Sequence, residues 1–338
     1  MKKNNITIKD IANKAGVSKA TVSYVINNKP GVSEKIRNKI LKIMKEMNYI
    51  PNAIARGLAG KKTHYIGLII PDISDMFYAD IIKGVENKTN SNNYLLNLVT
   101  THAEKAKEKQ VIDLFTGGIV DGGIVDGVII MAYHINEEYI KILKERNVPF
   151  VFIDYPFTTN SVYTVTVDNF DGGYKATEYL IKAGCKKIAF LKGSSVAWDS
   201  ENRFKGYLKA LNDYSIKIDD SIIKDANFRR EEGYTKTLEI LSNKDIDGVF
   251  AANDQMALGA MKAIKEKNLN IPEDISVIGF DNIESSKFSE PTLSTVEQPL
   301  CKMGEKSVEL LLELIDEKKP KSKKISLKTE LIKRKSTK

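Results

Sequence analysis

Several short side chains near the N-terminus can each donate and accept hydrogen bonds. They are Ser18, Thr21, Ser23, Asn27 and Ser33. Side chains of this kind bind the phosphate oxygens of a DNA duplex and fix the register of a protein on it. The same residue types also cap helices and form turns, so each can instead have only a structural role. Ser18 and Ser33 are placed to do both.

A second set of polar residues follows apolar runs in the rest of the chain. Its members are Asp72, Ser74, Asp154, Asn253, Asp254 and Asp281. Ligands of proteins with parallel sheets bind beyond the carboxyl ends of the strands, which is where these residues would lie. Their carboxylates and amides can hydrogen-bond the hydroxyl groups of a ligand. The alternative is that they only form the turns at which strands end.

The elements that must position this second set alternate along the chain. Strand-like apolar runs occur at 65–70, 94–99, 127–131, 149–153, 187–191, 248–252 and 276–280. Amphipathic segments of helical length lie between most of them, such as 78–90, 137–146, 172–183 and 202–213. Alternation of this kind predicts parallel sheets with helices on both faces.

Residues 1–51 have a different pattern, typical of three short helices. Ile8, Ile11, Ala12 and Ala15 have the spacing of one helix face, and Thr7 with Asp10 forms a variant capping box. Gly16 ends that helix, Ser18 begins a second with Val22, Val25 and Ile26 inward, and Ser33 begins a third. Two short helices joined by a tight turn containing glycine predict a helix-turn-helix, whose second helix enters the major groove of DNA. A small helical bundle with a solvated basic surface is the alternative.

The charge of the chain separates these two parts. Residues 1–62 hold 14 Lys and Arg against 3 Asp and Glu, a net charge of +11, whereas the whole chain of 338 residues is only +8. A basic head on a mildly acidic body predicts a polyanionic partner for the head alone. Two cysteines, Cys185 and Cys301, are too few for a disulfide framework, and no apolar run is long enough to span a bilayer. We therefore expect a cytoplasmic protein without a membrane or export segment.

The sequence lacks the motifs of the common enzyme classes. It has no Gly-x-Ser-x-Gly, no His-Glu-x-x-His and no Walker loop. The histidines His64, His102 and His134 do not have the spacing of metal ligands. Residues 118–127 repeat the string GIVDG twice in succession, but no Gly-Lys-Ser or Gly-Lys-Thr follows, so we interpret it as a loop insertion. We expect no catalytic activity, no metal and no cofactor.

Two long strings in the head identify a family resemblance. IKDIA at 8–12 with AGVSKATVS at 15–23, and MNYIPNAIARGL at 47–58, closely resemble the head of lac-repressor (LacI/GalR) family regulators. The resemblance extends over essentially the whole chain. It continues in IGLIIPD at 66–72, ANDQMALGA at 252–260, VIGFDN at 277–282 and ELIKRKST at 330–337.

The resemblance implies a fold and a set of domains. The fold would be an all-α helix-turn-helix DNA-binding head followed by an α/β periplasmic-binding-protein-like (type I) body of two lobes. The head would be residues 1–51, the hinge helix and linker 52–62, and the effector-binding and dimerisation domain 63–338. The first lobe would comprise roughly 63–162 and 293–338, and the second roughly 163–292.

The resemblance also implies roles in DNA binding. Base reading would fall to Lys19, Ala20 and Tyr24, and because Tyr24 lacks the fork that arginine presents to guanine, the half-site should differ from that of many relatives. Thr7 is a further expected contact. In the hinge the expected contacts are Asn52, Ala55 and Leu58. Leu58 would be a wedge between central base pairs of the minor groove, unless it is only a buried linker residue.

For the effector, the resemblance implies a cleft between the lobes. The family positions are Phe77, Asp154, Arg203, Phe228, Asn253 and Asp281, to which we add Asp72 and Ser74 from their place after a strand. Phe77 and Phe228 could instead be core residues. Trp198 is a weaker candidate. Purine-binding relatives carry an arginine where this chain has Ala197, which favours a carbohydrate or sugar phosphate over a purine.

The expected function is that of a homodimeric transcriptional repressor of carbohydrate-utilisation genes, bound to palindromic operator DNA and controlled by a sugar or sugar phosphate. One alternative is a catabolite-control regulator of the same family, whose co-regulator is a phosphorylated carrier protein. A more distant alternative is a solute-binding protein, which would need an export signal and has no use for a basic head.

Overall fold

The computed structural model describes residues 6–26, 29–49, 62–117, 124–155 and 162–338. The chain divides into two compact units, Met1–Thr63 and His64–Lys338, which we call the head and the body. The hinge residues Asn52, Ala55 and Leu58, as well as Asn27 and most of the GIVDG repeat, lie outside the described residues.

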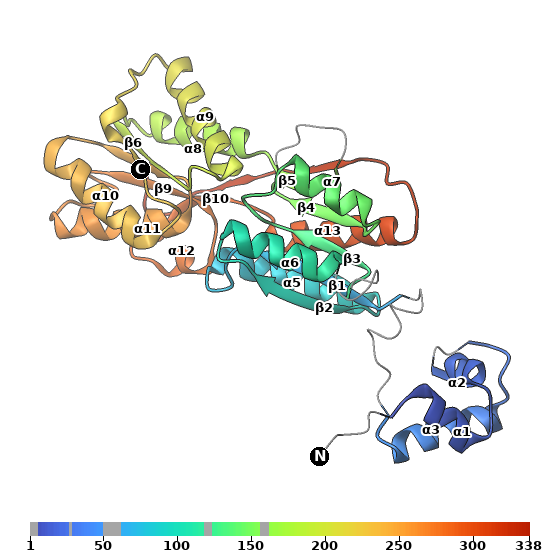
Figure 1. Ribbon diagram of the computed structural model, residues 1–338. Helices are drawn as coiled ribbons and strands as arrows, with labels where there is room; N and C mark the ends of the chain where they lie inside the picture. The colour runs from blue at the N-terminus through green and yellow to red at the C-terminus, as the bar shows by residue number, and fades with distance from the viewer. Residues whose placement is uncertain (1–5, 27–28, 50–61, 118–123, 156–161) are drawn as a thin grey trace. The chain divides into compact units, whose positions relative to one another are not determined.

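The head consists of three helices around a small core (Figure 1). They are α1 (Ile8–Ala15), α2 (Lys19–Ile26) and α3 (Glu34–Glu46). The core residues are Ile11, Ala12, Ala15, Val22, Val25, Ile40 and Ile43. The apolar spacing of the sequence predicts the three inward faces that the structure has, and the helix-turn-helix prediction is confirmed.

Local hydrogen bonds explain where these helices begin and end. The Asp10 carboxylate accepts hydrogen bonds from the backbone N of Thr7 (2.8 Å) and from its Oγ1 (2.7 Å). Gly16 ends α1 with a φ of 67°, a left-handed conformation that glycine adopts without strain. Ser18 Oγ accepts from the backbone N of Thr21 (3.1 Å) and so caps α2. Ser33 precedes α3 as expected, but its side chain makes no capping hydrogen bond.

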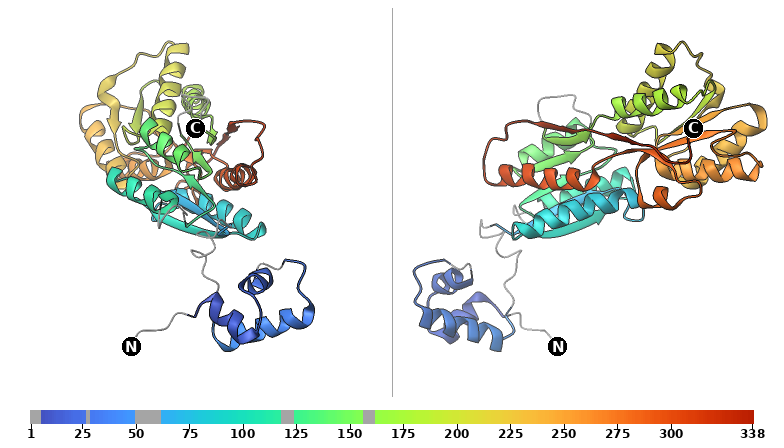
Figure 2. Two further views of the ribbon diagram at one scale, coloured as in Figure 1. Left: turned by 45° about the vertical axis from the view of Figure 1, so that its right-hand side comes forward. Right: turned by 180° about the vertical axis from the view of Figure 1, so that it is seen from behind.

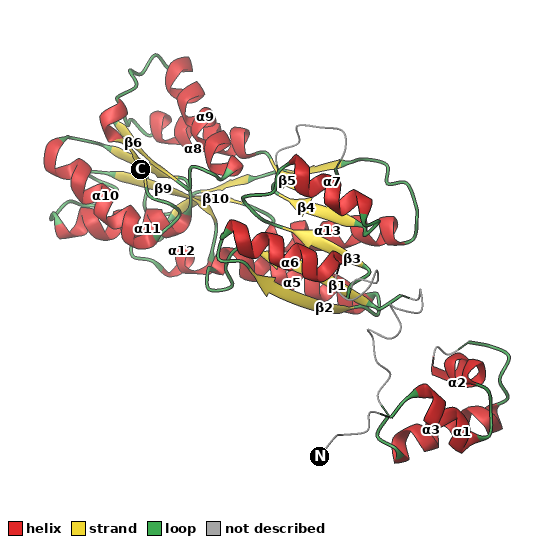
Figure 3. Ribbon diagram, in the orientation of Figure 1, coloured by secondary structure: helices red, strands yellow, loops and turns green. Residues whose placement is uncertain are grey.

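The body contains two six-stranded sheets, each with helices on both faces (Figure 3). The first sheet is entirely parallel, in the order β11 (Lys324–Leu327), β5 (Thr164–Val167), β4 (Phe150–Ile153), β3 (Gly127–Ile130), β1 (Tyr65–Ile70) and β2 (Leu95–Thr100). The second has the order β12 (Glu330–Ile332), β10 (Ser294–Glu297), β9 (Ser276–Asp281), β8 (Gly248–Ala251), β6 (Ile188–Lys192) and β7 (Ile223–Asp225). Only β12 runs antiparallel to its neighbour.

The helices form pairs that cover the sheets. The helices of the first sheet are α5 (Met76–Ser91), α6 (Lys105–Gly117), α7 (Glu137–Glu145) and α13 (Leu300–Ile315). Those of the second are α8 (Asn169–Lys182), α9 (Trp198–Asp213), α10 (Arg230–Asn243), α11 (Asp254–Glu266) and α12 (Glu284–Phe288), with a short 3-10 turn, η1 (Asp220–Ile222). Packing is closest where α5 crosses α13, since a Cβ on Gly84 would lie 1.9 Å from the carbonyl oxygen of Cys301.

The lobe boundaries differ from the prediction. β5 pairs with β4 and β11, so the first lobe extends past residue 162. β10 pairs with β9, so the second lobe extends past residue 292. The assignment of the whole C-terminal segment to the first lobe is wrong, because β12 pairs with β10 in the second sheet. The chain therefore crosses between the lobes three times, and its last residues run alongside the second lobe (Figure 2).

The core of each lobe lies between its sheet and its helices. The seven predicted strands are all present within one residue at either end, and every one of them is rich in fully buried apolar side chains except the edge strand β2. Within the described ranges, no helix is both long and apolar enough to cross a membrane.

Candidate functional site

A cavity of about 750 Å³, including its open mouth, lies between the two lobes of the body. Residues of the first lobe on its wall are Asp75, Phe77, Tyr78, Met131, Ala132, Tyr133, Ile135, Ile153, Asp154 and Tyr155. Those of the second lobe are Val196, Trp198, Asp199, Arg203, Phe228, Asn253 and Asp281. Aromatic rings and charged groups thus share one concave surface.

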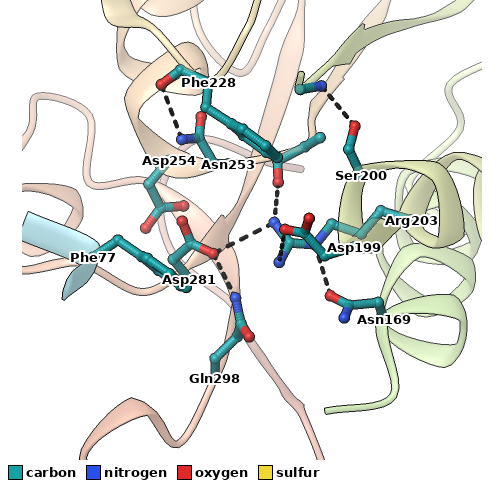
Figure 4. Close-up of polar contacts among 12 residues, drawn as sticks. Phe77, Asn169, Asp199, Ser200, Arg203, Phe228, Asn253, Asp254, Asp281 and Gln298 are labelled. Atoms are coloured by element: carbon teal, nitrogen blue, oxygen red, sulfur yellow. Dashed lines mark hydrogen bonds and ion pairs between the residues drawn. The ribbon is translucent and has the colours of Figure 1, made fainter. Parts of the chain in front are cut away.

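Arg203, on α9, is the most buried charged side chain of this wall, with 1% of its surface exposed. Its Nε donates to Asn169 Oδ1 (2.9 Å), as Figure 4 shows, and its Nη1 donates to the carbonyl oxygen of Ala252 (2.5 Å). The guanidinium lies over the ring of Phe280, 3.9 Å from its centroid. These contacts fix Arg203 in one orientation without any ligand.

Two carboxylates share the charge of Arg203. Asp199 Oδ2 is 3.2 Å from Nη2 of Arg203, and Asp281 Oδ1 is 3.6 Å from Nη1. Asp281 ends β9 with a φ of 113°, a conformation that is strained for a residue other than glycine. Gln298 Nε2 donates to Asp281 Oδ1 (2.7 Å). Burial raises the pKa of Asp281 well above its ordinary value, although the charge of Arg203 opposes this shift.

Asp154 follows β4 on the opposite side of the cavity, with a φ of 50°. Thr166 Oγ1 donates to its Oδ1 (2.7 Å). Its Oδ2 is buried and makes no hydrogen bond to any residue that the structure describes. Burial, and next the negative charge of Asp199, raise the pKa of Asp154 to about 6. One oxygen of this carboxyl group is therefore available to a ligand.

Asn253 and Phe228 form a third part of the wall. Asn253 Oδ1 accepts from the backbone N of Met256 (2.9 Å) and caps α11, while its Nδ2 donates to the carbonyl oxygen of Phe228 (3.1 Å). Phe228 has a φ of 62°, so its backbone is held in a left-handed conformation. Asn253 therefore positions the aromatic ring as well as lining the cavity.

The structure brings most of the predicted effector residues together. Phe77, Asp154, Arg203, Phe228, Asn253 and Asp281 all line the cavity, as does Trp198. Asp72 and Ser74 do not line it. Asp72 Oδ1 accepts from the backbone N and the Oγ of Ser74 (both 2.8 Å), which is the turn interaction that we gave as their alternative role. Asp254 lies behind the wall, where it accepts from Thr295 Oγ1 (2.5 Å) and from the backbone N of Ile283 (3.0 Å).

Five polar wall residues were not predicted, namely Asp75, Tyr78, Tyr133, Tyr155 and Asp199. Asp75 caps α5 by accepting from the backbone N of Phe77 (3.0 Å). Asp199 lies one helical turn before Arg203, and this spacing between opposite charges is a signal that the sequence offered. The hydroxyl groups of Tyr78 and Tyr133 are 3.2 Å apart.

The outer face of α2 in the head presents the predicted base-reading side chains. Lys19, Ala20 and Tyr24 are exposed, with 46% of Tyr24 accessible, while Val22 and Val25 on the opposite face are buried. Lys29 Nζ lies 5.9 Å from the centre of the Tyr24 ring. This face therefore combines positive charge with exposed hydrogen-bond donors, as a DNA-contacting helix requires.

The phosphate-binding candidates lie around the same helix. Ser18 and Thr21 are joined by a hydroxyl–hydroxyl hydrogen bond (2.9 Å), so both already have structural roles. Thr7, Ser18 and Ser33 are exposed, and Thr21 and Ser23 are half-buried. No cluster of three or more potential metal ligands occurs among the residues described.

Two family models match separate parts of the chain. Residues 7–52 match the model of bacterial regulatory proteins of the lacI family, and residues 177–337 match the periplasmic binding protein-like domain. The first match covers the three helices of the head, and the second covers most of the second lobe and the C-terminal segment.

Curated relatives match nearly the whole chain. The regulator RegA of Clostridium saccharobutylicum is 35% identical over 98% of this chain and 99% of its own. The repressor PurR of Pasteurella multocida is 36% identical over 98% of each chain. Catabolite control protein A of Priestia megaterium is 34% identical over 99% of this chain and 100% of its own.

Solved structures agree with these relatives. The lac repressor dimer bound to operator and the anti-inducer ONPF matches with a TM-score of 0.86 and 29% identity, over 98% of this chain and 99% of its own. The regulator CelR in complex with cellobiose matches with a TM-score of 0.75 and 28% identity over the same shares. These likenesses span the head and both lobes, and the chain is a DNA-binding transcriptional regulator that belongs to the lacI family of bacterial regulatory proteins.

Proposed function

We propose that this regulator represses carbohydrate-utilisation genes and that a sugar or sugar phosphate bound between the two lobes sets its affinity for operator DNA. The observation that carries the proposal is the composition of the cavity wall. Its rings, such as Trp198 and Phe228, can cover the apolar face of a sugar, while Asp154 and Asp281 can accept from adjacent hydroxyl groups. The similarity to CelR, which was solved with cellobiose, supports a carbohydrate.

The proposed mechanism uses the contribution of both lobes to one cavity. Asp154 and Phe77 come from the first lobe, and Arg203 and Asp281 from the second. A ligand that contacts both lobes stabilises one arrangement of them over another. In a cytoplasmic homodimer this change would reach the DNA through the segment that we assign as the hinge, residues 52–62, and so alter operator binding by the two heads, residues 1–51.

We propose that two heads read a palindromic operator with the outer face of α2. Lys19, Ala20 and Tyr24 would contact base edges. Ser23 and Ser18, the residue that caps α2, would contact phosphates, because neither side chain is long enough to reach base edges deep in the groove. The proposal assigns no enzymatic step and no cofactor to the protein.

A thermal-shift screen of the full chain with sugars and sugar phosphates tests the effector part of the proposal. A ligand present at 100 times its Kd adds about 2.7 kcal/mol to the free energy of unfolding, so a true effector raises the melting temperature clearly. The matched control is Asp281→Asn, which should remove most of the shift. A screen in which purines stabilise the protein and sugars do not would overturn the proposal. We do not expect a purine, because Ala197 stands where purine-binding relatives carry an arginine.

A second candidate is a catabolite-control regulator whose co-regulator is a serine-phosphorylated carrier protein. The similarity to catabolite control protein A over 99% of this chain favours it. A pull-down with the phosphorylated and unphosphorylated forms of the carrier distinguishes the two. Retention of the phosphorylated form alone would favour the second candidate.

A further inference from the structure

The charged side chains that line the cavity are not balanced. Among the lining residues that the structure describes, four carry carboxylates, and Arg203 alone carries a positive charge. The four are Asp75, Asp154, Asp199 and Asp281. With all of them ionised, the wall would have a formal charge of −3. In a partly desolvated cavity, charges of one sign repel each other much more strongly than they do in water.

The one arginine has little left to offer a ligand anion, because only its Nη2 makes no hydrogen bond to a residue that the structure describes. Its Nε is bound to Asn169 and its Nη1 to the carbonyl oxygen of Ala252, and Asp199 lies 3.2 Å from Nη2. The guanidinium also lies over the ring of Phe280. A phosphate group bound to Nη2 would lie beside the carboxylate of Asp199 and would add further negative charge to a cavity that Asp154 and Asp281 also line.

Asp154 differs from Arg203 in charge and offers a ligand a hydrogen-bond acceptor in place of a donor. Its Oδ2 is buried and makes no hydrogen bond within the described chain, although Thr166 satisfies Oδ1. Asp199 of the second lobe lines the same cavity as this carboxyl group of the first lobe, and its negative charge contributes to the raised pKa of Asp154. Two carboxylates from different lobes therefore face one space, and their repulsion opposes the approach of the lobes.

Aromatic rings surround the same space. Tyr133 and Tyr155 line the cavity on the side of Asp154, and Trp198 lines it on the side of Asp199. Rings of this kind attract an ammonium group that lies over their faces. They also cover the apolar face of a sugar ring, so they suit a molecule that has both features.

We propose that the effector is a basic sugar, of the amino-sugar class, whose ammonium group lies between Asp154 of the first lobe and Asp199 of the second. This inference rests on the proposed carbohydrate effector and specifies its chemical class. A neutral hydroxyl could donate to Asp154 Oδ2 but would leave the repulsion between the lobes unchanged. An ammonium group both donates and cancels charge, so it holds the two lobes together.

Matched ligands on one scaffold test the inference. We would titrate the full-length protein by calorimetry at pH 7 with glucose, glucosamine, N-acetylglucosamine and glucose 6-phosphate, and with the galactose and mannose equivalents. On at least one scaffold the amine should bind at least tenfold more tightly than the neutral sugar, and the phosphate should bind more weakly than both. The N-acetyl form separates charge from bulk, since it keeps the nitrogen and loses the charge.

Three variants assign the preference to residues. Asp154→Asn and Asp199→Asn should each reduce the preference for the amine to less than threefold. Asp245→Asn removes an exposed carboxylate that does not line the cavity and should leave the preference unchanged. Thermal unfolding checks that each variant is folded. If only one of Asp154→Asn and Asp199→Asn is folded, that variant alone is sufficient for the test. Equal binding of amine and neutral sugar, or a preference that survives both substitutions, would overturn the inference and leave the proposed function intact. No binding by any sugar would overturn both.

Discussion

The ring of Phe228 rests directly on the backbone of Gly193, so that a Cβ at position 193 would lie 2.1 Å from Cζ of the ring. The carbonyl group of Phe228 is held by Asn253 from the other side. The ring that faces the cavity is therefore fixed by the protein before a ligand arrives. A preorganised wall of this kind reduces the entropy that a ligand must lose on binding.

This contact predicts the effect of Gly193→Ala. The added methyl group must displace the ring, because its nearest neighbours would be ring atoms at 2.1–2.5 Å. We expect ligand affinity to fall by at least tenfold, while the head remains folded and operator DNA is still bound. Calorimetry with the stabilising sugar measures the change. Ser195→Ala, at an exposed position in the following loop, is the control, and the same loss in both variants would contradict the account.

Arg203 should contribute to stability as well as to binding. Arg203→Ala leaves Asp281, Asp199 and Asn169 without their buried partner, and removal of one member of a buried ion pair costs about 3–5 kcal/mol. Urea unfolding monitored by circular dichroism should show this loss in the body. Arg230→Ala, which removes an exposed arginine bonded to Gln255, should cost less than about 1 kcal/mol. If both substitutions lower the free energy of unfolding by the same amount, the buried network does not stabilise the second lobe.

Stability should depend on pH through Asp254. Burial raises the pKa of this carboxyl group from 3.8 to about 7 in the folded protein. Between these two pH values the folded state binds more protons than the unfolded state, so the free energy of unfolding falls as pH rises from about 4 to about 7.

The variant Asp254→Asn isolates this contribution. The amide does not titrate but can still bond Thr295 and Ile283, so the decrease of the melting temperature between pH 5 and pH 8 should be smaller than in the wild type. Some decrease should remain, because the pKa of Asp154 and of Asp281 is also raised. Parallel melting profiles in the two proteins would contradict the assignment to Asp254.

In the head, two substitutions should have different effects. Tyr24→Ala removes an exposed side chain from the outer face of α2 and should relax base preference at particular operator positions by about 1–3 kcal/mol. Ser23→Ala should weaken binding to all sequences about equally. Selection from a randomised operator library distinguishes these outcomes, and an unchanged motif with Tyr24→Ala would remove its base-reading role.

The sequence predicted the fold where burial is continuous along the chain. The run at Tyr65–Ile70 is apolar at nearly every position, and the structure has a strand with the same ends. Five strands were not predicted, because they are short and contain polar residues, namely β5, β7, β10, β11 and β12. β11 pairs with β5, and β12 with β10, only after the chain has crossed between the lobes again, and local sequence patterns do not encode such crossings.

The site residues that were predicted best are those that lie at the carboxyl ends of strands. Asp154 and Asp281 come directly after β4 and at the end of β9, where α/β proteins bind ligands. Asp75 and Asp199 instead lie at the beginnings of helices, and only the packing of the two lobes brings them to the same cavity. The strand-end rule also selected Asp72, whose carboxylate is used by Ser74 in a local turn.

Control of operator binding by a ligand in the cavity is the central claim. The most direct test measures the affinity of the full-length protein for its palindromic operator by fluorescence anisotropy, with and without the sugar that stabilises it. Coupling between two sites changes affinity by about 5- to 150-fold in regulated proteins, and we expect a change in that range. The change should disappear in Asp281→Asn, because the carboxylate beside Arg203 is lost. An operator affinity that shifts by less than twofold at saturating sugar, or equally in the variant, would contradict the account.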